Sequence, residues 1–136
     1  MALGDQLGES SAKISGTKVL ASEGQHVKME VSFQGRSTML GEELADYGTY
    51  WQTLRSGGVI YGEGNVVWLT NDGESIRWWG FGVGRPTGPP PAGHFAVCGS
   101  AQTESQRFIR LKSVATLTEY DADEEGNYHW TLWEWK

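Results

Sequence analysis

The sequence predicts an all-β fold: a single eight-stranded antiparallel up-and-down barrel with at most one short helix. Glycine is abundant, at 19 of 136 residues, and the chain also contains 7 Trp, 5 Tyr and 4 Phe. Glycine and aromatic residues are poor or mediocre helix formers, and aromatic residues favour strands. Turn signals recur at strand-length intervals, at 23–24, 56–58, 71–73, 86–93 and 124–127. Short strands at regular spacing are typical of barrels and sandwiches, and the consecutive hairpins favour a barrel.

The elements follow from these turns and from alternation between them. Residues 1–13 show no clear period and are expected to form a loosely ordered N-terminal lead-in, with a single β-barrel domain over 14–136. Alternation of apolar and polar residues is clearest from Val27 to Phe33, as in a strand with one buried face. Residues 104–112 could form the short helix. The expected strands lie near 14–22, 26–39, 44–55, 59–70, 75–85, 93–103, 113–122 and 127–135.

Composition excludes several classes of protein and site. The single cysteine, Cys98, rules out an internal disulfide framework and a cysteine-based zinc cluster, and the three histidines lack metal-ligand spacing. The formal charge of −6 argues against nucleic-acid binding, which requires a basic surface. The sequence has no apolar run long enough for a signal peptide or a membrane span. We therefore expect a cytoplasmic protein with no metal, no cofactor, no nucleic-acid partner and no membrane association.

The hairpin between Val59 and Arg85 carries the main functional hypothesis. Asp72-Gly73 reads as a two-residue turn, which would pair residues whose numbers sum to 145. One face would then be apolar near the turn and hollowed by glycines farther away. The cross-strand pairs expected on that face are Tyr61–Gly84, Glu63–Gly82, Asn65–Gly80, Val67–Trp78 and Leu69–Ile76.

An apolar floor with a few polar groups is typical of a ligand-binding lumen. The expected ligand-binding residues are Tyr61, Glu63, Asn65, Leu69 and Trp78. Trp78 and Leu69 would supply apolar contact, while Glu63 and Tyr61 would orient a polar or cationic end of the ligand. Two alternatives stay open: the glycines could serve only the bending of a small barrel, and a one-residue slip would exchange the two faces.

The C-terminal strand predicts self-association, because aromatic residues occupy both of its faces. Trp130 and Leu132 point one way, while Trp133 and Trp135 point the other. A strand that is apolar on both faces is normally covered on both. The second cover could be a partner subunit, the N-terminal segment or an exposed hydrophobic patch, and a homo-oligomer is the expectation.

Two segments resemble the allene oxide cyclase-like superfamily of small calycin-like barrels, which includes the dirigent proteins. They are Phe108–Tyr120, which is followed by an acidic Gly-Asn hairpin, and the hairpin from Tyr61 to Gly84 with its Gly-x-Gly spacing. In size and hairpin pattern the chain is most similar to functionally unassigned bacterial members. The resemblance implies an eight-stranded barrel with an apolar lumen, often in oligomers, and assigns no catalytic residue to this chain.

The leading functional hypothesis is a barrel that binds a small hydrophobic or amphipathic molecule in its lumen. One alternative is an isomerase or cyclase acting on a hydrophobic substrate in the same lumen, with Glu63 as the acid or base. Another is a structural oligomer whose interior is packed with side chains.

Overall fold

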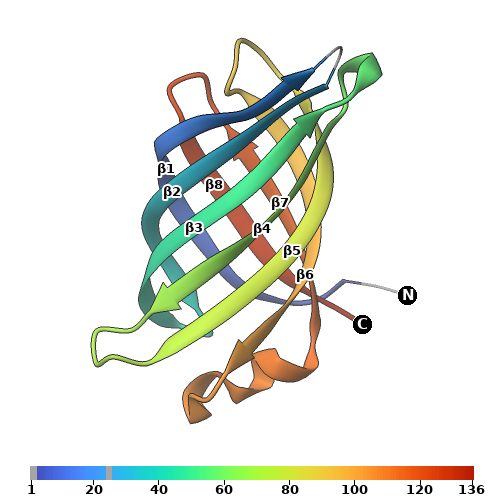
Figure 1. Cartoon of the computed structure of the whole chain (residues 1–136). Helices are drawn as coiled ribbons and strands as arrows, with labels where there is room; N and C mark the ends of the chain where they lie inside the picture. Colours follow the sequence, from blue (N-terminus) through green and yellow to red (C-terminus); the bar gives the residue numbers. More distant parts are fainter. Residues whose placement is uncertain (1–2, 24–25) are drawn as a thin grey trace.

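The protein is a closed antiparallel β-barrel in which eight strands follow one another in chain order, as predicted (Figure 1). The computed structural model describes residues 3–23 and 26–136. Two 3₁₀ segments lie in the connections between strands: η1 (Ser56–Gly58) follows the third strand and η2 (Gln106–Ser113) follows the sixth. The strands are β1 (Leu3–Glu23), β2 (His26–Met39), β3 (Glu42–Leu54), β4 (Ile60–Leu69), β5 (Ser75–Pro86), β6 (Gly93–Thr103), β7 (Ala115–Ala122) and β8 (Asn127–Trp135).

The first strand begins earlier than the sequence suggested. From Leu3 onward the expected lead-in is part of β1, and its pairing with β8, from Leu3–Trp135 to Lys13–Asn127, closes the barrel. The inward residues here include Ser10 and Ala12, which are small and buried. Because small residues give no hydrophobic contrast, the alternation of this half-strand is invisible in the sequence. The barrel therefore requires residues that the sequence analysis placed outside the domain.

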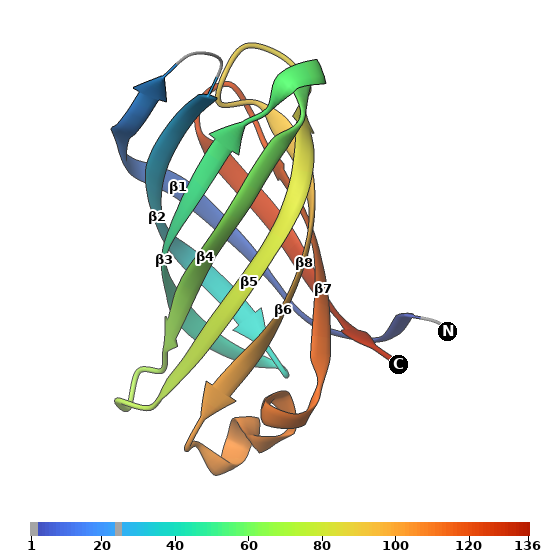
Figure 2. The same cartoon turned by 45° about the vertical axis from the view of Figure 1, so that its right-hand side comes forward.

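One end of the barrel is closed by η2, which lies in the segment where the sequence predicted a short helix (Figure 2). Phe108 and Leu111 of this segment are fully buried. They belong to the same core cluster as inward side chains from the neighbouring strands. Those with exposed fractions of 2% or less are Leu7, Met39, Leu44, Trp68, Ile76 and Leu132.

Two arginines tie η2 to the barrel. Arg107 Nη2 lies 2.9 Å from Asp72 Oδ1 and 2.6 Å from Glu74 Oε2, in the β4–β5 turn. Arg110 Nη2 lies 2.6 Å from Oε2 of Glu134, whose side chain is buried. Because these contacts reach elements on both sides of η2, they hold Phe108 and Leu111 in place as a plug.

The β4–β5 register differs by one residue from the prediction, and the cause is the turn. The residue numbers of paired residues on the two strands sum to 144, as in Leu69–Ser75 and Ile60–Gly84. Thr70 N donates to Glu74 O, so three residues form the loop instead of two. The φ angle of Gly73 is +89°, whereas the φ angle of Asp72 is not positive. A type I′ turn needs positive φ at both central positions, so the predicted two-residue turn was wrong.

Candidate functional site

The corrected register places four glycines together on the inner face of the β4–β5 hairpin. Gly62 pairs with Gly82, and Gly64 pairs with Gly80. These pairs lie on the same face as the buried residues Val66 and Trp78, because side-chain direction alternates along a strand. Two successive cross-strand pairs therefore contribute no side chain to the lumen.

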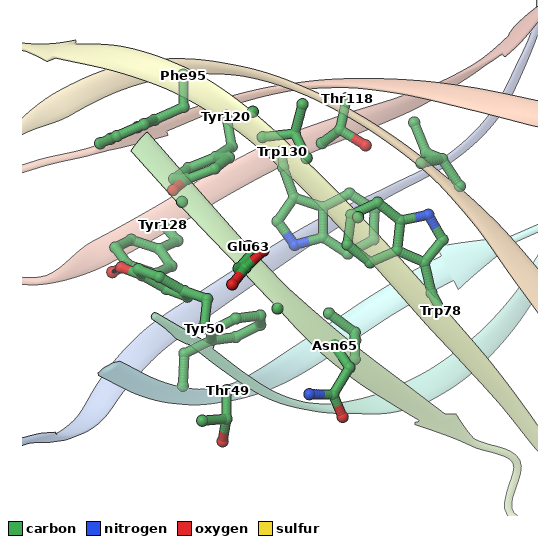
Figure 3. Close-up of a pocket in the computed structure, with 18 of the residues that line it drawn as sticks. Thr49, Tyr50, Glu63, Asn65, Trp78, Phe95, Thr118, Tyr120, Tyr128 and Trp130 are labelled. Atoms are coloured by element: carbon green, nitrogen blue, oxygen red, sulfur yellow. Dashed lines mark hydrogen bonds between the residues drawn. The ribbon is translucent and has the colours of Figure 1, made fainter. Parts of the chain in front are cut away.

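A cavity of about 80 Å³ lies against this bare wall. Its lining is dominated by aromatic rings from the opposite and neighbouring strands, as Figure 3 shows. A volume of about 80 Å³ is several times the roughly 10–15 Å³ that one water molecule needs. The inward side chains that line it include Phe33, Tyr50, Trp68, Trp78, Phe95, Thr118, Tyr120, Tyr128, Trp130 and Leu132.

Trp78 is held in a fixed orientation at the edge of this cavity. Its Nε1 donates to Thr116 Oγ1 at 3.0 Å, and the Thr116 hydroxyl donates to Gly99 O at 3.0 Å. The indole also lies over glycine backbone: a Cβ atom at Gly80 would come within 2.1 Å of its ring. Glycine at this position thus leaves the space that the ring occupies.

Three tyrosines form a polar cluster on the other side of the cavity from Trp78 and Trp130 (Figure 3). The hydroxyls of Tyr50 and Tyr128 are hydrogen-bonded to each other, and the Tyr120 ring centroid lies 5.7 Å from that of Tyr128. Burial raises the pKa of Tyr128 to about 12 and raises the pKa values of Tyr50 and Tyr120 well above the ordinary value. All three phenols are therefore uncharged hydrogen-bonding groups at neutral pH.

Two other polar atoms of the lining residues have no hydrogen-bond partner within the described part of the chain. They are Nε1 of Trp68, whose side chain is 1% exposed, and Oγ1 of Thr118, which is 7% exposed. The ring centroids of Trp68 and Trp130 lie 5.9 Å apart. Thr118 on β7 pairs with Leu132 on β8, two residues beyond Trp130. Both atoms thus belong to side chains around the same part of the lumen.

Of the five residues predicted to bind a ligand, Trp78 is the one whose side chain lies in the lumen. Tyr61 and Glu63 lie on the outer face, where the Tyr61 hydroxyl donates to Glu63 Oε2 at 3.1 Å. Asn65 and Leu69 share that face and are exposed. Glu63 and Asn65 border the cavity because they flank Gly64, but alternation turns their side chains outward. The expectation that Tyr61, Glu63, Asn65 and Leu69 project inward was wrong for one reason, the extra turn residue.

Most of the lining residues could not be found from the β4–β5 hairpin alone, because they lie on other strands. Parity provides a signal for some of them: Tyr128, Trp130 and Leu132 share one face of the last strand. Phe33 and Tyr50 come from strands whose relation to that face depends on the closure of the barrel. Their meeting with Tyr128 therefore needs the whole topology.

Two sites of other kinds are not found in residues 3–23 and 26–136. No group of three or more His, Cys, Asp or Glu side chains there is arranged to hold a metal ion. No helix in the same residues has the length and apolar character needed to cross a membrane.

The comparisons with known proteins identify the fold. No protein-family model and no curated protein matches the chain. A protein of unknown function from Clostridium acetobutylicum superposes with a TM-score of 0.84 at 12% identity, covering 100% of both chains. A conserved protein of unknown function from Rhodopseudomonas palustris gives 0.81 at 14% identity, covering 98% of both. A β-barrel-like protein from Acinetobacter baumannii gives 0.79 at 15% identity, covering 99% of this chain and 96% of its own. At these identities the similarity establishes a small β-barrel fold shared with proteins of unknown function.

Proposed function

We propose that this barrel binds a small, uncharged and largely apolar molecule in its lumen. The observation that carries the proposal is the cavity of about 80 Å³ between the four-glycine wall and the aromatic rings. By volume, it accommodates a molecule of about five to eight non-hydrogen atoms before any side chain moves. A ligand of that size would be largely enclosed by the rings.

The cavity is built into the sequence by residue choice. Protein interiors are close-packed, and voids larger than a water molecule are few. Glycine inside a strand weakens it, so an inward glycine is costly unless close packing requires it or the space is used. At Gly64, Gly80 and Gly82 a Cβ atom would lie 2.5, 2.1 and 2.2 Å from neighbouring atoms, so close packing requires these three glycines. A Cβ atom at Gly62 would have Trp51 O, at 3.7 Å, as its nearest neighbour. Ordinary packing would have filled this position with a larger residue.

The lining favours an uncharged ligand. Glu63 is the one charged residue among the lining residues in the described chain, and its side chain points outward. An ion placed among the rings would lose its hydration without gaining a counter-charge, which costs several kcal/mol. A cationic ligand end oriented by Glu63, as expected from the sequence, is therefore not part of the proposed ligand.

The same observations bear on the alternatives. A purely structural barrel needs a filled interior, and here the interior contains a cavity. An isomerase or cyclase using Glu63 would need that carboxylate beside the substrate, whereas its Oε2 accepts a hydrogen bond from the Tyr61 hydroxyl on the outer face of β4. Binding without an acid–base step is therefore the better-supported function.

A thermal-shift and tryptophan-fluorescence screen of small neutral molecules tests the proposal. We expect saturable stabilisation by compounds of about five to eight non-hydrogen atoms, since a ligand that binds the folded state raises its unfolding temperature. Charged analogues of the same size should give no shift. Glu63→Gln is the matched control on the outer face and should leave the response unchanged. The proposal fails if no neutral compound in this size range stabilises the protein.

A further inference from the structure

The unpartnered atoms of Trp68 and Thr118 constrain the chemistry of the ligand. Each side chain is more than nine-tenths buried, and each lines the cavity. Buried polar groups are almost always hydrogen-bonded, and leaving one unpaired costs about 1–3 kcal/mol. Two such atoms around one cavity indicate partners that the chain itself does not supply.

A neighbouring pair shows how the same residue types look when the chain satisfies them. Trp78 Nε1 donates to Thr116 Oγ1, and Thr116 in turn donates to a backbone carbonyl. Thr116 and Thr118 lie two residues apart on the inner face of β7. Thr116 and Thr118 therefore differ in whether their hydroxyls are hydrogen-bonded within the chain, although both are threonines on the same face of the same strand.

The donor inventory selects the complementary group. Indole Nε1–H is a donor that cannot accept, and a threonine hydroxyl can donate one hydrogen bond. A carbonyl oxygen has two lone pairs and can accept from both groups while remaining uncharged. An apolar remainder of the molecule would then lie against the glycine wall at Gly62, where a Cβ atom would meet nothing closer than 3.7 Å.

We propose that the lumen ligand is a small neutral carbonyl compound whose oxygen accepts hydrogen bonds from Trp68 Nε1 and Thr118 Oγ1. This inference rests on the proposed function, because it names the chemical class bound at the same site. It adds a specificity that apolar enclosure alone does not provide: a ketone, aldehyde or amide should bind in preference to a hydrocarbon of the same shape.

Calorimetric titration with cyclohexanone and methylenecyclohexane tests this specificity. The two probes have the same ring and the same number of non-hydrogen atoms, and differ in an oxygen against a methylene. We expect cyclohexanone to bind the wild-type protein about tenfold more tightly, the effect of one to two net hydrogen bonds. Thr118→Val and Trp68→Phe should each lower the affinity for cyclohexanone several-fold and leave the affinity for methylenecyclohexane nearly unchanged. Thr116→Val, whose hydroxyl is already bonded within the chain, should keep the preference.

The ligand-free protein gives a second readout. Thr118→Val replaces an unpaired hydroxyl with a methyl of similar size, so its melting temperature should equal or exceed that of the wild type. Thr116→Val removes a bonded hydroxyl and should melt at a lower temperature. This readout needs no ligand, and it keeps the inference testable if Trp68→Phe fails to fold.

The outcomes separate the two proposals. Equal binding of both probes, with no effect of Thr118→Val, would overturn the carbonyl assignment and leave lumen binding intact. Failure of the wild-type protein to bind either probe would overturn the carbonyl assignment, and lumen binding would fall with it only if no neutral compound stabilises the protein in the thermal-shift screen. A lower melting temperature for ligand-free Thr118→Val would show that the chain already satisfies this hydroxyl, and would also overturn the carbonyl assignment.

Discussion

Tyr128 connects the aromatic lining of the lumen to its polar groups. Its ring packs edge-on against Phe33, with centroids 5.6 Å apart, and its hydroxyl is bonded to that of Tyr50. The phenol is 4% exposed, and burial raises its pKa to about 12. The same burial that makes the lumen apolar therefore keeps its tyrosines protonated.

Stability should fall at high pH because of these tyrosines. The unfolded chain loses the Tyr128 proton near pH 10, whereas the folded chain retains it to about pH 12. Between those values the folded state binds more protons, so the free energy of unfolding should fall by about 1.4 kcal/mol per pH unit for this group. Urea denaturation across this range measures the slope. Tyr128→Phe should make the slope shallower by this amount, and the slope that remains comes from Tyr50 and Tyr120, whose pKa values are also raised by burial. An identical slope in Tyr128→Phe would contradict the account.

The β4–β5 hairpin shows what could be predicted from the sequence and what could not. Both strands were placed to within a residue at each end, and Gly80 and Gly82 were correctly associated with a hollow face, whereas Gly62 and Gly64 were assigned to the opposite face. Asp72-Gly73 is compatible with a two-residue or a three-residue loop, and backbone conformation decides between them. Since side chains alternate with a period of two, that single residue exchanged the inner and outer sets of β4.

Filling the glycine wall should stabilise the barrel and abolish binding. Gly62→Val adds a β-branched side chain where a Cβ atom meets nothing closer than 3.7 Å, so we expect a gain of about 1 kcal/mol. Gly82→Ala is the contrasting variant, because its Cβ atom would lie 2.2 Å from Ala96 O. It should lose about 1–3 kcal/mol. Urea denaturation checks both signs, and a destabilised Gly62→Val would mean that the cavity is smaller than described.

Opening the closed end tests the role of η2. Phe108→Ala removes a fully buried ring, and we expect a loss of about 3–5 kcal/mol in the free energy of unfolding. Ile109→Ala, on the exposed side of the same segment, should change stability by less than about 1 kcal/mol. Similar losses in the two variants would show that η2 does not act as a plug.

The topology of the whole molecule was predictable, because turn signals separate most of the strands in the sequence and the chain order is a simple meander. The closing contact was not, since β1 meets β8 through small inward residues without a hydrophobic signature. The lining of the lumen depends on that closure. Trp78 could be identified as a lining residue because it lies on the β4–β5 hairpin itself. Tyr50 and Thr118 lie on other strands and reach the cavity only once the barrel is closed, so the sequence did not identify them.

The outer surface carries an apolar row consistent with the predicted self-association. Trp79, Phe81 and Val83 on β5 are each about half exposed. Cross-strand pairing continues the row from β5 to the C-terminal strand through Phe81, Cys98, Leu117 and Trp133. Exposed apolar patches of this kind are uncommon on monomers. We expect a homo-oligomer that the double variant Trp79→Ser, Phe81→Ser converts to monomer in sedimentation velocity, whereas Val19→Ser does not. A monomeric wild-type protein at high concentration would contradict this expectation.

The most direct test of lumen binding is calorimetric titration of the wild type and Gly62→Val with cyclohexanone. We expect saturable binding at a single site in the wild type. We expect no measurable binding in Gly62→Val, which should be folded and at least as stable, because the added side chain occupies the cavity. No binding to the wild type would contradict the carbonyl ligand, and equal binding to both proteins would contradict a ligand site in the lumen.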